Sequence, residues 1–82
     1  MIKHKNWMLL REGVKACKVG YEFTDIEKFS LHRWNLKDAV IQRGRVWDVS
    51  ANYMICYVDN DGVVKHIYTT KEAKRMLKIG RL

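Results

Sequence analysis

The apolar residues of this chain change their spacing near residue 44, from a helical repeat to the alternation of a β-strand. Over residues 25–43 they recur at steps of three and four, with the apolar stem of Arg33 completing the repeat between Phe29 and Leu36, which is typical of a helix with one buried face. The side chains that this helix should bury are Ile26, Phe29, Leu36, Ala39 and Val40. Gly44 can adopt the left-handed backbone conformation that often ends a helix, so we expect the helix to end there. In an alternative pattern, Asn35 with Asp38 starts a second short helix.

After Gly44, three segments rich in β-branched and aromatic residues predict antiparallel strands at 46–49, 53–58 and 63–69. Extended segments at 7–10 and 14–19, joined by a turn at Glu12-Gly13, would extend the sheet. The same residues also fit one short helix. The predicted fold class is therefore α+β: a small antiparallel sheet of three and up to five strands, with a central helical region and a C-terminal amphipathic helix.

Local signals mark the turn and both helix starts. Residues 59–62, Asp-Asn-Asp-Gly, predict a hairpin turn in which Gly62 adopts a positive φ. Thr24 with Glu27, and Thr69 with Glu72, have the spacing of a capping box, in which two side chains bind the free backbone N–H groups at a helix start. A helix should therefore begin near Thr70, and Gly80 should end it.

The middle predicted strand has two candidate core faces. Met54, Cys56 and Val58 form the more uniformly apolar of the two sets, so we expect them to face the C-terminal helix. Tyr53 and Tyr57 would then lie on the other face with Ile55, free to stack on a base or to close a second small core. Further core positions are expected at Val49, Ile67, Met76 and Leu77.

Composition adds a charge asymmetry to this picture. The chain has 82 residues, 48% of them hydrophobic, and a net charge of +7, which suits a single domain over 1–82. Both ends are basic, whereas residues 21–61 are slightly acidic. If the two ends meet in the fold, they form a surface that attracts polyanions. No apolar run is long enough for a signal peptide or a membrane span, so we expect a cytoplasmic protein with no membrane partner.

Catalytic and metal-binding patterns are not recognisable in the sequence. Cys17 and Cys56 lie far apart along the chain without paired spacing, and we interpret both as free buried thiols. His32 and His66 have no acid or nucleophile at a suggestive spacing. We therefore expect no enzymatic activity, no metal and no cofactor.

The last forty residues resemble two families of DNA-binding domain. The order of "VWDVS", "YMICYVDNDGVVKHIYTT" and "KEAKRMLK" is strand, aromatic-rich strand, glycine turn, strand, threonine cap and helix. This order, over residues 44–78, resembles the DNA-binding domains of plant ethylene-response factors and the amino-terminal domain of tyrosine integrases. The resemblance implies a three-stranded sheet whose exposed face enters the major groove. The strand-turn-strand-helix ending also resembles the RelE-type ribosome-dependent ribonuclease toxins, which implies a messenger RNA substrate.

These observations favour a small basic nucleic-acid-binding protein of phage or mobile-element origin that binds mainly phosphates, with DNA preferred over RNA. The predicted contact residues are Arg43, Arg45, Tyr53, Tyr57, Lys65, Lys71, Lys74, Arg75 and Lys78. The alternative is a phage-type inhibitor that binds and blocks a host protein complex of defence or nucleic-acid processing. Exposed Trp7, Trp34 or Trp47 would favour this alternative, because tryptophan is enriched at interface hot spots. A RelE-like ribonuclease toxin is a further alternative.

Overall fold

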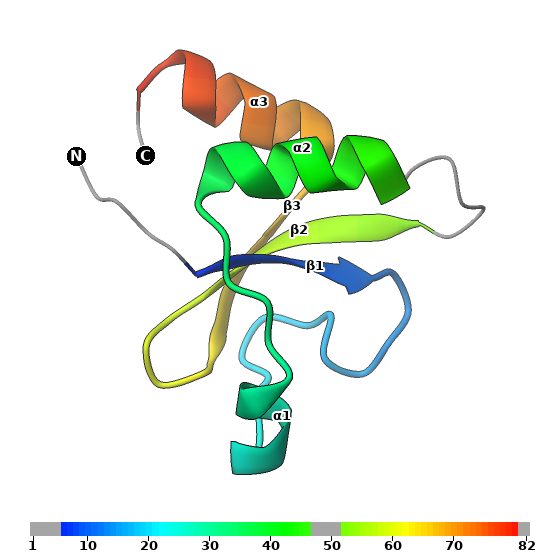
Figure 1. The fold of residues 1–82 in the computed structure, drawn as a ribbon, viewed down its shortest axis with the longest axis vertical. Coiled ribbons are helices and arrows are strands. Elements are labelled where there is room, and N and C mark those ends of the chain that lie inside the picture. The colour runs from blue at the N-terminus through cyan, green and yellow to red at the C-terminus, as the bar shows by residue number, and fades with distance from the viewer. Residues whose placement is uncertain (1–5, 47–51, 81–82) are drawn as a thin grey trace.

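The fold is a three-stranded antiparallel sheet with two helices on one face and an irregular segment on the other (Figure 1). A computed structural model of the protein describes residues 6–46 and 52–80. These residues form β1 (Trp7–Arg11), α1 (Asp25–Phe29), α2 (Leu36–Val46), β2 (Tyr53–Val58), β3 (Val64–Tyr68) and α3 (Thr70–Lys78). The strand order is β1-β2-β3. The predicted α+β class is confirmed.

The strand beside β2 on one side comes from the N-terminal part of the chain. In the β1–β2 pair, Trp7 lies opposite Tyr57 and Arg11 lies opposite Tyr53. The strand predicted at 7–10 is therefore confirmed, and its helical alternative is wrong. The prediction of a second extended segment at 14–19 is also wrong, because these residues form turns and bends. Of the strand predicted at 46–49, Val46 is the last residue of α2, and residues 47–49 lie outside the described part of the chain.

The β2–β3 hairpin turns at residues 59–62, as predicted. Gly62 has a φ of 85° and donates its N–H to the Asp59 carbonyl at 3.1 Å. The Asp59 carboxylate accepts the backbone N–H groups of Val63 at 2.9 Å and Asp61 at 3.0 Å. These hydrogen bonds lower the pKa of the Asp59 carboxyl group, and the bond from Val63 has the largest effect. The turn is thus closed by contacts among residues that are neighbours in sequence.

Both predicted capping boxes are present. The Thr24 hydroxyl accepts the Glu27 N–H at 3.2 Å, and the Glu27 carboxylate accepts the Thr24 N–H at 2.9 Å. The same pair of bonds joins Thr69 and Glu72, at 3.2 Å and 3.3 Å. Gly80, with a φ of 68°, follows the end of α3 as predicted. The two helices that these boxes begin are α1 and α3.

The helical region predicted at 25–43 is divided into α1 and α2. Trp34 exchanges two backbone hydrogen bonds with Trp7, each 2.9 Å long, so the chain between the helices is extended along β1. Asn35 accepts the Asp38 N–H at 2.8 Å at the start of α2, which confirms the alternative of a second helix. Gly44 does not end this helix, because α2 continues to Val46 and Gly44 has no positive φ.

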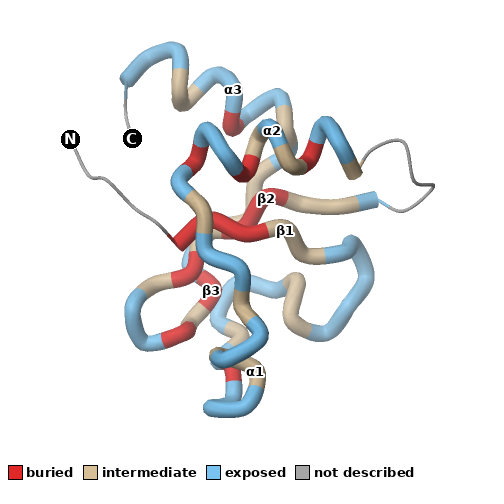
Figure 2. The backbone as a smooth tube through the Cα atoms, viewed as in Figure 1, coloured by how far each residue is buried: buried red, intermediate tan, exposed pale blue. Residues whose placement is uncertain are grey.

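The sheet is covered on both faces and has two cores, and Figure 2 marks the buried residues of the strands and of the helices over them in red. The helix-side core lies under α2 and α3, and its buried residues are Trp7, Leu36, Ala39, Ile55 and Ala73. The loop-side core lies under residues 12–31, and its buried residues are Met8, Phe23, Cys56, Val58 and Val64. The predicted assignment of the β2 faces is therefore wrong: Ile55 and Tyr57 face the helices, and Cys56 and Val58 face the irregular segment. Both faces are apolar, so the alternation alone does not identify the helix-covered one.

Helix α1 projects from the body of the molecule (Figure 1). Ile26 is 82% exposed and Phe29 is 93% exposed, so their predicted core positions are wrong. The physical reason is the short length of α1, which ends before the chain joins the edge of β1. Leu36 and Ala39 are buried as predicted, and the half-buried residues that pack against the two cores include Val40, Ile67, Met76 and Leu77. Val49 lies outside the described residues.

Folding brings together the two cysteines that lie far apart in sequence. Both are free thiols, as predicted; Cys56 is buried and Cys17 is half-buried against the same loop-side core. Burial raises the pKa of the Cys56 thiol, and contact with Cys17 raises it further. A thiol held protonated in this way is a packing group rather than a nucleophile.

Candidate nucleic-acid interface

Helices α2 and α3 lie side by side over the same face of the sheet (Figure 1), and both carry exposed cations. They contact each other, and Ala39 of α2 and Ala73 of α3 are both fully buried in the helix-side core. Their polar sides therefore face the solvent. We define the basic helical surface as the exposed cations of these two helices: Lys37, Arg45, Lys71, Lys74, Arg75 and Lys78. Asp38 and Glu72 are the carboxylates within α2 and α3.

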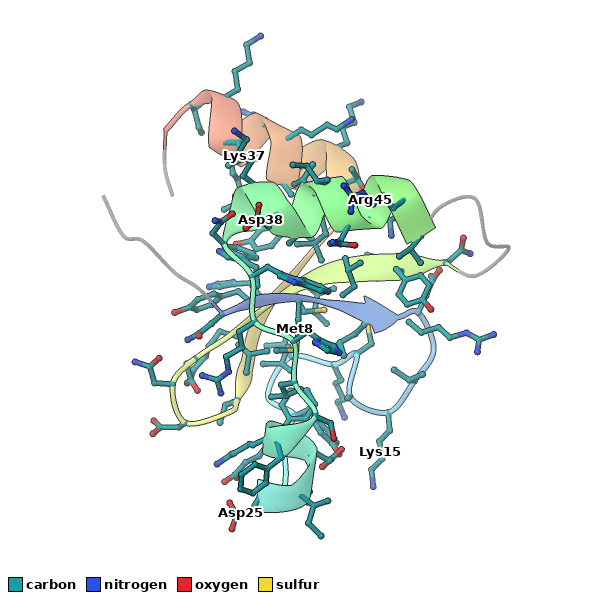
Figure 3. The ribbon with its side chains drawn as sticks, in the orientation of Figure 1. Met8, Lys15, Asp25, Lys37, Asp38 and Arg45 are labelled. Carbon is teal, nitrogen blue, oxygen red and sulfur yellow. The ribbon has the colours of Figure 1, made fainter. Side chains whose placement is uncertain are left out.

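The structure brings five of the nine predicted contact residues onto this surface. Arg45 is exposed on α2 and is labelled in Figure 3 together with Lys37. The other four form the row on α3: Lys71, Lys74, Arg75 and Lys78. Four cations against one carboxylate give α3 a net charge of +3. Such a row suits phosphate contacts, which need positive charge but no fixed base sequence.

Arg43 is a correction to the predicted contact set. Its side chain is on the inner side of α2, and the residue is only 6% exposed. Burial lowers the pKa of Arg43, while the carboxylate of Glu12 acts in the opposite direction. Arg43 is therefore not part of the basic helical surface.

The remaining three predicted residues do not belong to the basic helical surface. Tyr53 is half-buried opposite Arg11, and Tyr57 is half-buried with its ring centroid 5.2 Å from that of Trp7. Lys65 is exposed at the hairpin end of β3, where its Nζ lies 3.5 Å from the Asp59 carboxylate. The hairpin turn lies away from α3 in Figure 1.

Tyr57 belongs to an aromatic row on β2 and β3 whose other members, His66 and Tyr68, were missed by the sequence prediction. The ring of His66 lies between Tyr57 and Tyr68, with centroid distances of 6.3 Å and 5.7 Å. Trp7 is buried beside them, 5.7 Å from Tyr68. His66 is exposed, and both tyrosines are half-buried. The signal that would have found this row is the two-residue spacing of His66 and Tyr68, which places both rings on one face of β3.

A pocket of about 400 Å³ adjoins this row, between the end of β3 and α3. Its lining residues are Tyr68, Glu72, Arg75, Met76 and Ile79. Burial raises the pKa of the Tyr68 phenol, and the nearby Glu72 carboxylate acts in the same direction. The Glu72 Oε1 also accepts the Thr69 hydroxyl at 2.9 Å, so the capping box fixes the carboxylate at the rim of the pocket.

The centre of the sheet is closed to solvent on both sides. Ile55 and Cys56 point to opposite faces of β2, and both are fully buried. The resemblance to sheet-reading DNA-binding domains implies an exposed face at this position. In the described structure, the helices rather than the middle of the sheet carry the large exposed cationic surface.

Comparisons of the chain with protein-family models, curated proteins and solved structures find no match. Among residues 6–46 and 52–80, no group of three His, Cys, Asp or Glu side chains is placed to hold a metal ion. Within the same residues, no helix has both the length and the apolar character needed to span a bilayer. Trp7 is buried, Trp34 is half-buried, and Trp47 lies outside the described residues.

Proposed function

We propose that the protein binds nucleic acid, mainly through phosphate groups, with the basic helical surface. The observation that supports this most directly is the side-by-side packing of α2 and α3, which gathers six exposed cations on one layer. Lysine and arginine side chains that displace condensed counterions from a nucleic acid gain affinity regardless of base sequence. The net charge of +7 also favours rapid encounter with a polyanion.

The decisive experiment compares two charge reversals that change the total charge equally but lie on different surfaces. We expect Lys74→Glu combined with Lys78→Glu to weaken binding of a labelled duplex by about tenfold or more, because two cations no longer neutralise phosphates and two carboxylates repel them. The control is Lys15→Glu with Lys18→Glu, on the segment that covers the opposite face of the sheet. Fluorescence anisotropy measures both dissociation constants.

Equal weakening by the two double variants would show that only net charge matters, and it would contradict a localised interface. Binding by neither the wild type nor the variants at low salt would reject the proposed function.

A second candidate function is the binding and blocking of a partner protein, and α1 is the observation that favours it. Ile26 and Phe29 are almost fully exposed, one turn apart on the projecting helix. Residues 21–30 around them carry three carboxylates against one lysine, so the apolar pair lies in acidic surroundings. We call this region the α1 tip. Its charge complements a partner with a basic surface around an apolar centre, as a nucleic-acid-processing protein has.

Phe29→Ser should weaken such a complex by about thirtyfold, since an exposed aromatic anchor of this kind is a hot-spot residue. The control is Ile41→Ser, which removes an exposed apolar side chain from α2 instead. Affinity capture from nuclease-treated host lysate identifies the partner, and titration with the purified partner measures the loss. Equal affinities for both variants would exclude the α1 tip as the interface. Self-association that depends on Phe29, seen by ultracentrifugation, would replace the partner by a second copy of the chain.

A further inference from the structure

The pocket between β3 and α3 lies beside the basic helical surface, but phosphate binding does not account for the kinds of residue that line it. Arg75 belongs to both, since it lines the pocket and is part of the cationic row on α3. The other lining groups are unlike the lysine row: an aromatic ring, Tyr68, and two flexible apolar side chains, Met76 and Ile79. A volume of about 400 Å³ is within the usual range for small-molecule sites, roughly 300–1,000 Å³.

One side of this pocket is formed by the ring of Tyr68, which packs against two other rings. Tyr68 contacts Trp7 and His66, with ring centroids 5.7 Å away in both cases. Its pKa is raised, so the phenol stays neutral at physiological pH. Ile79 is 56% exposed at the rim, and the Glu72 carboxylate is fixed at the edge by Thr69. The pocket thus combines a stacking surface, apolar side chains, a cation and a hydrogen-bond acceptor.

We propose that this pocket binds one unpaired base of a single-stranded nucleic acid whose phosphates lie on the basic helical surface. This inference rests on the proposed function. Every base has a π-face that stacks on an aromatic side chain, and such stacking tolerates any base sequence. An N–H group on the edge of a base, such as the N3–H of thymine, can donate to Glu72, while Arg75 contacts the adjoining phosphate.

A strand that follows the α3 cations therefore passes the pocket at Arg75. A base in a duplex is paired and stacked on its neighbours, and it enters the pocket only after extrusion, which costs a few kcal/mol. The protein should consequently bind a single strand more tightly than a duplex of equal charge.

The test compares a labelled oligothymidylate with a labelled blunt-ended duplex that has no unpaired bases. Tyr68→Leu removes the ring but keeps an apolar side chain against Trp7, and it should weaken single-strand binding by about fivefold to a hundredfold. Duplex affinity should change by less than about twofold. Tyr68→Phe keeps the ring and should bind the single strand as the wild type does.

A second pair of variants keeps the test valid if Tyr68→Leu impairs folding. Ile79→Ser opens the rim of the pocket, and Val19→Ser removes an equally exposed side chain, 57% against 56%, on the irregular segment. Only Ile79→Ser should weaken single-strand binding, and the thermal unfolding midpoints show whether each variant is folded.

The outcomes separate this inference from the proposed function. Unchanged single-strand affinity in Tyr68→Leu and Ile79→Ser, or equal losses on the single strand and the duplex, would overturn the base pocket. Duplex binding that depends on Lys74 and Lys78 would then still support the basic helical surface. A loss in Tyr68→Phe equal to that in Tyr68→Leu would also overturn it, because the hydroxyl rather than the ring would carry the contact. Binding to neither probe would reject both proposals.

Discussion

The affinity of the protein for duplex DNA should fall several hundredfold when the salt concentration rises from about 50 to about 200 mM. Each phosphate that is neutralised on duplex DNA contributes about −0.9 to the slope of log affinity against log salt. With about five phosphates neutralised by the exposed cations of α2 and α3, the slope should be near −4.5. Fluorescence anisotropy at several salt concentrations gives this slope directly.

The slope also reports how many phosphates a variant no longer neutralises. Lys74→Glu with Lys78→Glu should reduce its magnitude by about 1.8, because two cations are removed from the interface. The variant with Lys15→Glu and Lys18→Glu should keep the wild-type slope. A wild-type slope shallower than about −2 would mean that the cations of the two helices do not bind phosphates together.

Ile55→Ala should lower the free energy of unfolding by about 2–5 kcal/mol. Ile55 is fully buried in the helix-side core, between the sheet and the two helices, so its replacement removes apolar packing and leaves a cavity. A domain of this size is stable by only about 5–15 kcal/mol, so the decrease is a large fraction of the total. Denaturant unfolding followed by circular dichroism measures it.

Ile26→Ala is the matched control, since it makes the same substitution at a residue that is 82% exposed. Its effect should stay within about 0.5 kcal/mol. Ile55→Val, at about 0.5–1.5 kcal/mol, supplies a milder change if the alanine variant does not fold. A destabilisation at Ile26 as large as that at Ile55 would show that α1 is docked rather than exposed.

The two candidate functions use opposite ends of the molecule and opposite charges. The basic helical surface lies on α2 and α3, whereas the α1 tip projects from the far side of the sheet (Figure 1). Variants at Lys74 and Lys78 and variants at Phe29 are therefore expected to act independently. Nucleic-acid binding that is unaffected by Phe29→Ser would show that the tip takes no part in nucleic-acid binding.

The sequence alone determined the features whose hydrogen bonds join residues that are neighbours in the chain. Thr24 and Glu27, like Thr69 and Glu72, lie three residues apart and form their hydrogen bonds within a single turn. The Asp59–Gly62 turn needs a glycine that adopts a positive φ. It also needs the Asp59 carboxylate, which accepts N–H groups from the residues two and four positions later in the chain. The cationic row on α3 also follows from its sequence, because one apolar stripe fixes which side faces the solvent.

Only the tertiary structure decided which surfaces are covered. Residues 53–58 are apolar on both faces, so the choice between Ile55 and Cys56 for the helix side depends on which distant segment packs there. Ile26 and Phe29 fit a helical core pattern, yet pairing of Trp34 with Trp7 diverts the chain and leaves them exposed. The same long-range packing buries Arg43, sets Tyr68 beside Met76 and Ile79, and brings Cys17 against Cys56. Alternation and periodicity define the faces of an element, but contacts between residues far apart in sequence select the face that becomes core.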